Sequence, residues 1–152
     1  PAAAVAAITP EITAIWDEMI AAMEAMEGHG VGLAAPQIGV MLRLAVVDCH
    51  DARGQALRLA NPRIVSASTA LAPYPEASPC LPGVSAEITR PCEVRVAFLN
   101  ARGEEEEQAF TGLWAVSVQH QIDHLEGRMY FDRLSRLKRD RLLAKAAKLR
   151  RR

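Results

Sequence analysis

The segment GLWAVSVQHQIDHLEG, residues 112–127, decides the fold of this chain. Its apolar side chains recur every three to four positions and a glycine stands at each end, which is typical of a packed amphipathic helix. His120 and His124 are four positions apart, so a helix directs both imidazoles toward the same side. We therefore expect a central helix over residues 112–125 that carries two neighbouring histidines.

The histidine spacing has two interpretations. It is the spacing of the two metal ligands in a zinc-binding HExxH helix. Histidine pairs at this distance also occur by chance in ordinary helices, so the spacing alone does not decide between a metal site and a structural pair. Gln121 occupies the position of the glutamate in HExxH.

Working outward from this helix, the preceding sequence predicts one more helix and then many short strands. Thr9, followed by Pro10 and Glu11, is a helix start, Gly28 is the expected stop, and the apolar stripe that runs from Ile12 to Met26 is expected in the core. Alternating or apolar runs predict strands at 42–48, 57–60, 63–66, 84–89, 93–99 and 104–110. The four consecutive glutamates of the last strand predict a charged sheet edge that resists further strand pairing. Asn61-Pro62 is expected to separate the second strand from the third, and 84–89 and 93–99 to run antiparallel around Arg90-Pro91.

This order of elements predicts a single α+β domain over residues 1–152, with short antiparallel sheets around the central motif-bearing helix. Half of the 152 residues are hydrophobic, which suffices for a core and excludes a disordered or collagen-like chain. We identify no signal peptide and no apolar run of the roughly 20 residues that span a bilayer, so no membrane partner is expected. Three scattered cysteines argue against a disulfide scaffold and favour the reducing cytoplasm.

The net charge of zero conceals an uneven distribution. Residues 1–132 carry eight arginines, no lysine and 17 acidic side chains, whereas residues 133–152 carry ten basic side chains and one acid, Asp140. The basic tail is rich in helix formers, with an apolar stripe of Leu134, Leu137, Leu142 and Leu149. It is either a solvated surface helix or a docking surface for a polyanion such as RNA.

Two further segments have compositions that suit a site. GVGLAAPQIG, residues 30–39, has glycines that let the backbone approach a ligand closely, with the amide of Gln37 beside them; a structural turn is the alternative. YPEASPCLPG, residues 74–83, is proline-rich and contains one thiol, Cys80, which is either a metal ligand or a small apolar side chain.

Together, GVGLAAPQIG, the proline-glycine loop and QHQIDHLEG resemble the peptide deformylase family in order and spacing, from Thr9 to the C-terminus. That family removes the formyl group from the N-terminal methionine of nascent bacterial chains. The resemblance implies a divalent metal, Fe or Zn, held in part by His120 and His124. It implies nascent polypeptide N-termini as partners, and a C-terminal helix, here residues 133–152, that contacts ribosomal RNA.

The resemblance also implies roles for residues of the first motif. Gln37 falls on the glutamine that helps to hold the formyl oxygen. The substrate is expected against the backbone of Gly30, Val31, Gly32 and Leu33.

Two of the three family signatures depart from the pattern at residues that carry the chemistry. Gln121 replaces the glutamate that takes a proton from metal-bound water and delivers it to the leaving amine, and an amide cannot exchange a proton near neutral pH. In a gapless alignment Glu76 matches the family glutamate, Ser78 falls on the metal-binding cysteine, and Pro79 on the leucine whose N–H steadies the oxyanion. Proline has no N–H to give, and a hydroxyl is a poorer ligand than a thiolate for Zn²⁺ or Fe²⁺.

An alternative alignment with a two-residue deletion keeps Cys80 as the third metal ligand. The gapless alignment is preferred because it preserves both flanks without shortening a loop that shapes the pocket. The sequence thus leaves three hypotheses: an active metal-dependent amidohydrolase that uses Cys80, a non-catalytic protein that binds peptide N-termini or the ribosome, and a structural partner of a true deformylase.

Overall fold

The computed structural model describes residues 1–26, 31–50 and 54–151, which form three α-helices, seven strands and two short 3₁₀ turns. In chain order they are α1 (Pro10–Glu24), β1 (Gly32–Ala34), η1 (Ala35–Ile38), β2 (Leu44–Val47), β3 (Leu57–Ala67), β4 (Leu71–Glu76), β5 (Ala86–Pro91), β6 (Glu93–Leu99), β7 (Glu105–Thr111), α2 (Gly112–Leu125), η2 (Tyr130–Arg133) and α3 (Arg136–Arg150). No helix among the described residues is long and apolar enough to cross a membrane.

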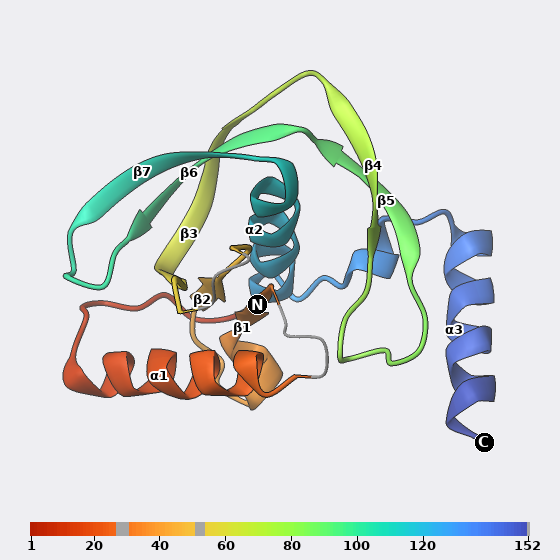
Figure 1. Ribbon diagram of the computed structural model, residues 1–152, viewed down its shortest axis with the longest axis horizontal. Helices are drawn as coiled ribbons and strands as arrows, with labels where there is room; N and C mark the ends of the chain where they lie inside the picture. Colours follow the sequence, from red (N-terminus) through yellow and green to blue (C-terminus); the bar gives the residue numbers. More distant parts are fainter. Residues whose placement is uncertain (27–30, 51–53, 152) are drawn as a thin grey trace.

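Helix α2 lies at the centre of the molecule, and the other elements surround it (Figure 1). Five strands form one antiparallel sheet in the order β1-β2-β3-β6-β7, and β4 and β5 form a second, two-stranded sheet. Helix α1 crosses below this arrangement, and α3 stands on the outer side of β4 and β5 (Figure 1). The α+β class and the predicted bounds of the central helix are confirmed.

The predicted core stripe of α1 is buried against β1 and β2. Thr9 caps the helix by accepting a hydrogen bond from the Ile12 N–H at 3.3 Å, and Trp16, Met19 and Met23 are fully buried. Gly28, the expected stop, lies outside the described residues. A second apolar cluster joins the inner face of β3, β6 and β7 to α2. The central helix is therefore packed on its apolar side, which leaves its histidine-bearing side for polar neighbours.

Two strand predictions are wrong: that Asn61-Pro62 separates two strands, and that residues 84–89 and 93–99 pair around Arg90-Pro91. β3 runs through Asn61-Pro62 with a shift of register between Ala60 and Arg63. β5 and β6 do not pair with each other, because β5 pairs with β4 and β6 with β3. Residues 57–76 and 86–99 thus form one long antiparallel ribbon that bends around α2 between the two sheets (Figure 1).

The prolines made the fourth strand difficult to recognise. β4 contains Pro73 and Pro75, and neither proline can donate a backbone hydrogen bond. Among the described strands β4 pairs only with β5, and prolines are tolerated on such an edge strand. The four consecutive glutamates likewise lie at an edge, since β7 is the last strand of the five-stranded sheet, as their charge predicted.

The basic tail is helical, but the helix begins at Arg136, where Ser135 caps it by accepting from the Lys138 N–H at 3.3 Å. Its buried face differs from the predicted leucine stripe, because Leu137 is 60% exposed. Ala146 instead packs with Leu142 and Leu143 against the loop that follows β4. The exposed basic face of α3 therefore lies opposite the face that packs against this loop.

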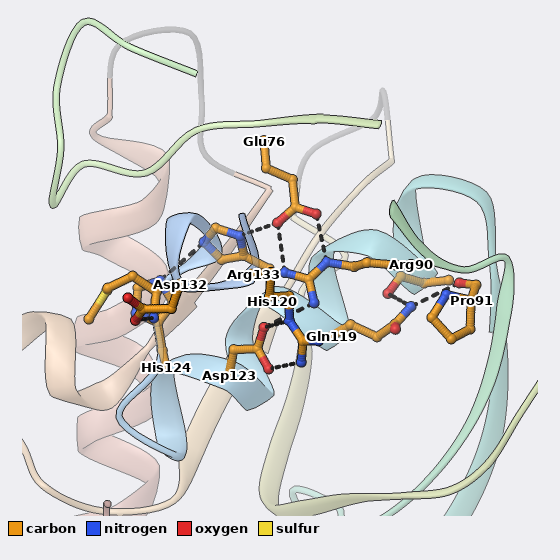
Figure 2. Close-up of polar contacts among 11 residues, drawn as sticks. Glu76, Arg90, Pro91, Gln119, His120, Asp123, His124, Asp132 and Arg133 are labelled. Carbon is orange, nitrogen blue, oxygen red and sulfur yellow. Dashed lines mark hydrogen bonds and ion pairs between the residues drawn. The ribbon is translucent and has the colours of Figure 1, made fainter. Parts of the chain in front are cut away.

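A buried ion-pair network joins the two-stranded sheet to α2 and η2 (Figure 2). Arg90, whose side chain is 2% exposed, donates from Nε and Nη2 to the two carboxylate oxygens of Glu76 at 2.6 and 2.9 Å. Its Nη1 donates to Oδ2 of Asp123 at 2.9 Å. Arg133 donates to both oxygens of Asp123 at 2.6 and 2.7 Å. One guanidinium thus links β4, β5 and α2, and a second links α2 to η2.

Burial alone would raise the pKa of the Glu76 carboxyl, but its bonds to Arg90 and His120 and their charges bring the net pKa below its usual range. The same holds for Asp123, where Arg133 and Arg90 overcome the effect of burial and lower the pKa. Both carboxyls are therefore ionised at neutral pH, which is the state that the two arginines bind.

The first prediction concerns the bend in β3. Asn61 has a left-handed backbone with φ of 50°, and its side chain accepts from the N–H and donates to the carbonyl of Val5, both at 2.8 Å. Asn61→Ala should lower the free energy of unfolding by about 2–3 kcal/mol, because it removes both bonds and leaves a strained residue. Asn61→Gly should lose less, since only the bonds are removed. Urea titration measures both, with Ser66→Ala on the same strand as a control expected to stay within about 0.5 kcal/mol; equal losses for Ala and Gly would contradict the backbone argument.

The second prediction concerns the ion-pair network. Arg90→Met should reduce the free energy of unfolding by about 3–5 kcal/mol, because it leaves two buried carboxylates without their shared cation. The matched control is Arg95→Met, which breaks a half-exposed pair with Glu107 at 3.1 Å and should cost at most about 1 kcal/mol. Denaturant unfolding at pH 7 gives both values. Similar losses in the two variants would show that the buried network is not a principal support of the fold.

Candidate functional site

A cleft of about 650 Å³ lies between β1, α2 and the segment after β4. Its walls combine apolar side chains, such as Val31, Leu113 and Val116, with a few polar groups, as is usual for small-ligand sites. The predicted site residues among its lining are Val31, Gly32, Gln37, Ser78, Pro79, His120 and Gln121. The three sequence motifs, far apart along the chain, thus meet at one cleft.

The two histidines converge on each other at the base of this cleft. Nε2 of His120 and Nε2 of His124 are 3.1 Å apart, and Nδ1 of His120 is 2.8 Å from Oε1 of Glu76 (Figure 2). Because Glu76 is ionised and can only accept, Nδ1 of His120 carries the proton of this hydrogen bond. A carboxylate behind a histidine is the usual support of a metal-binding imidazole.

His124 is held in its neutral form. Burial, followed by the neighbouring His120, lowers its pKa to about 4. Neutral imidazole is the form that binds metals, so the side chain does not need to lose a proton at neutral pH before it acts as a ligand. Only His120 of the pair lines the cleft, whereas His124 is buried beside it.

The loop after β4 contains both candidates for the third metal ligand, Ser78 and Cys80. Ser78 is buried in the cleft wall, and its Oγ accepts a hydrogen bond from the Cys80 N–H at 3.3 Å. Cys80 is exposed and outside the cleft lining, with its Sγ 3.9 Å from Nε2 of Gln37. Ser78 therefore lines the cleft and Cys80 does not, and which of the two takes the third ligand position stays a prediction.

Gln121 lies against the glycine-rich segment. A Cβ at Gly32 would be 2.6 Å from Gln121 Nε2 and 2.6 Å from Ser117 Oγ, so any residue other than glycine would require these two side chains to shift. Ser117 donates to the carbonyl of Val31 at 3.0 Å. The Oε1 atom of Gln121 is buried and has no hydrogen-bond partner within the described part of the chain. The central helix and the first motif are therefore in direct contact at Gln121.

The remaining residues of the first motif have divided roles. Gln37 lies in η1, where its Oε1 accepts from the Ala34 N–H at 2.9 Å and its Nε2 donates to Sγ of Cys80 at 3.9 Å. The side chain of Leu33 is 2% exposed and belongs to the core with α1 rather than to the cleft. Gly30 lies outside the described residues.

Sequence reasoning missed the roles of Arg90 and Ser117 and the pairing of Arg133 with Asp123. The buried position of Arg90 could be recognised from the sequence, because Arg90 lies two residues after Ile88 on the same, inward face of β5. A charged residue at such a core position requires a partner. Arg133 had been counted with the basic tail, whereas it ends η2 and binds Asp123. Ser117 has no signal in the sequence beyond its place on the motif helix.

Both the sequence and the structure are similar to those of known proteins. The sequence matches the family model "Polypeptide deformylase" over residues 1–140. The peptide deformylase of Caulobacter vibrioides is 40% identical over 149 residues, 97% of this chain and 85% of that protein. That of Phenylobacterium zucineum is 41% identical over 143 residues, 93% of this chain and 83% of that protein.

The structure is also similar to the solved structure of a peptide deformylase. The crystal structure of a peptide deformylase from Legionella pneumophila superimposes with a TM-score of 0.90 at 35% identity, covering 99% of this chain and 87% of that one. The match thus includes all three motifs and the helix order. This chain belongs to the polypeptide deformylase family, whose members are metal-dependent hydrolases.

Proposed function

We propose that this chain binds formyl-methionine N-termini of nascent polypeptides, as its family does, but hydrolyses the formyl amide weakly or not at all. The observation that carries the proposal is Gln121, which lines the cleft at the position of the family's proton-transferring glutamate. An amide can hydrogen bond but cannot move a proton between water and a leaving amine. General acid–base catalysis contributes typically about 10²–10⁴-fold in rate, so a loss of at least that size is expected.

No described neighbour in the cleft is free to replace the missing base. Glu76 is the one carboxylate among the described lining residues, and both of its oxygens are engaged by Arg90 and His120. Pro79 adds a second deficit, since the backbone at this position has no N–H to stabilise an oxyanion. Gln37 remains able to offer its amide nitrogen to a formyl oxygen.

The donor set fits a divalent metal only in part. His120 and His124 present converging ring nitrogens, which suits Fe²⁺ or Zn²⁺. Within residues 1–26, 31–50 and 54–151, however, no group of three or more His, Cys, Asp or Glu side chains is placed to hold a metal ion. With a serine hydroxyl in the third position, the affinity for metal should fall well below that of a site with a thiolate.

A second candidate is an active metal-dependent amidohydrolase that uses Cys80. It is favoured by the position of the thiol, whose Sγ faces the amide of the cleft residue Gln37 at 3.9 Å. A rearrangement of the loop 77–83 would be needed, because Cys80 now lies outside the cleft lining. Metal binding that depends on Cys80 and not on Ser78 would favour this candidate.

The third prediction is a test of turnover. The purified chain should contain less than one equivalent of Fe, Zn or Ni, and should release formate from formyl-Met-Ala-Ser at least about 10²-fold more slowly than the triple variant Gln121→Glu, Ser78→Cys, Pro79→Leu. Elemental analysis and a formate assay give both values. Stoichiometric metal with comparable formate release by the unmodified chain would overturn the proposal.

The triple variant restores the base, the thiolate and the backbone donor together, so metal content and formate release should rise in parallel. The control is Gln108→Glu, which makes the same chemical change at a glutamine of β7 that is outside the cleft lining. No gain in the triple variant would show that the site has been assigned to the wrong residues.

We also propose that α3 docks on ribosomal RNA, which would place the cleft near emerging chains in the cytoplasm. Arg141, Lys145 and Lys148 are exposed and spaced at i, i+4 and i+7, so they share one face of the helix. The opposite face packs on the loop 81–84 through Ala146. A basic face of this kind raises association with phosphate regardless of the net charge.

The fourth prediction tests this face. Replacing Arg141, Lys145 and Lys148 by Gln should weaken co-sedimentation with ribosomes and reduce the slope of binding against salt by about three charges. The matched control replaces three exposed arginines of the acidic body, Arg63, Arg95 and Arg102, which removes the same charge elsewhere. Equal effects of the two triple variants would mean that net charge rather than α3 determines the binding.

A further inference from the structure

The polar surface of the cleft carries no unpaired negative charge. Of the described lining residues only Glu76 is acidic, and its carboxylate is shared between Arg90 and His120 at 2.6–2.9 Å. Any cation that entered the cleft would therefore find the Glu76 carboxylate already paired with Arg90, and no free counter-charge among the described lining residues. Burying an ammonium without a counter-charge is strongly unfavourable.

Gln121 supplies an acceptor that has no partner among the residues that the structure describes. Its side chain is 4% exposed, and Oε1 makes no hydrogen bond to the described residues. The contact of its amide with Gly32 limits where the side chain can move, and the neighbouring hydroxyl of Ser117 already donates to Val31. A buried acceptor left unsatisfied is costly, so this atom favours a ligand that brings one N–H to it.

Formylated and free peptide N-termini differ in charge and in the number of N–H donors. A formylated terminus is a neutral secondary amide with a single N–H, which one neutral acceptor satisfies. A free terminus is largely an ammonium at pH 7, with three donors and a full positive charge. The family glutamate would be a counter-charge for that ammonium, whereas the amide of Gln121 is not.

We propose that Gln121 is a specificity-determining residue that makes the cleft select N-formylated over free-amine peptide termini, with Oε1 accepting the N–H of the formamide. The inference rests on the proposed function, because the formylated chain must remain intact to be retained. The replacement of glutamate by glutamine then converts a hydrolytic site into one that recognises its former substrate and rejects its former product.

The test measures affinity, not turnover, on the full chain as purified. Titration calorimetry at pH 7 compares formyl-Met-Ala-Ser with Met-Ala-Ser. The formylated peptide should bind at least about tenfold more tightly to the unmodified chain. Gln121→Leu should lose most of this preference because it removes the acceptor, and Gln121→Glu should shift it toward the free amine because it restores a carboxylate.

Gln108→Leu on β7 is the matched control and should leave the preference unchanged, and a thermal melt of each variant checks the fold. Equal affinities for the two peptides in the unmodified chain, or a preference that survives in both Gln121 variants, would overturn the inference. Formate released during the titration is measured in the same samples. Rapid release with the preference intact would overturn the proposed function alone, whereas equal affinities without release would overturn this inference alone.

Discussion

The guanidinium of Arg90 between Glu76 and Asp123 is the contact on which the arrangement of the site depends. It holds two carboxylates from different elements, β4 and α2, in a place from which water is largely excluded. Glu76 in turn fixes the proton of His120 on Nδ1, and Asp123 adjoins His124 along the helix. Without this cation the carboxylates would repel each other and burial would favour their neutral forms. The orientation of the histidine pair is thus a consequence of an arginine that does not line the cleft.

This dependence separates the residues that support the histidine pair from the other residues that line the cleft. The residues that support the pair, Glu76, Arg90 and Asp123, bind one another and not a substrate, so their contacts do not require the site to be active. Gln121, Ser78 and Pro79 line the cleft, Gln121 from α2 and the other two from the loop after β4, and they take no part in the ion-pair network. Replacing them changes the chemistry offered to a ligand and leaves the buried charges balanced.

The sequence predicted those parts of the structure whose signals are local. The bounds of α2, the Thr9 cap of α1 and the edge position of the glutamate strand all follow from short-range periodicity, capping or charge. The long ribbon was not predicted, because its pairing joins residues 57–76 to residues 86–99, which are distant in sequence. Its prolines also resemble the residues that end strands. At the site, the sequence motifs predicted which segments form the cleft. They did not predict that Arg90 and Arg133 bind Glu76 and Asp123, because these pairs join residues from different elements.

The position of α3 shows why the charge asymmetry of the chain is structural as well as electrostatic. The basic tail could have been a tethered helix, free of the acidic body. Ala146 is instead 1% exposed against Leu81 and Val84, two residues that also line the cleft. A Cβ at Gly83, in the same loop, would be 3.1 Å from the side chain of Leu149, so helix and loop are closely packed. The outer basic face is therefore fixed relative to the wall of the cleft, and a polyanion bound to that face would hold the cleft at a defined orientation.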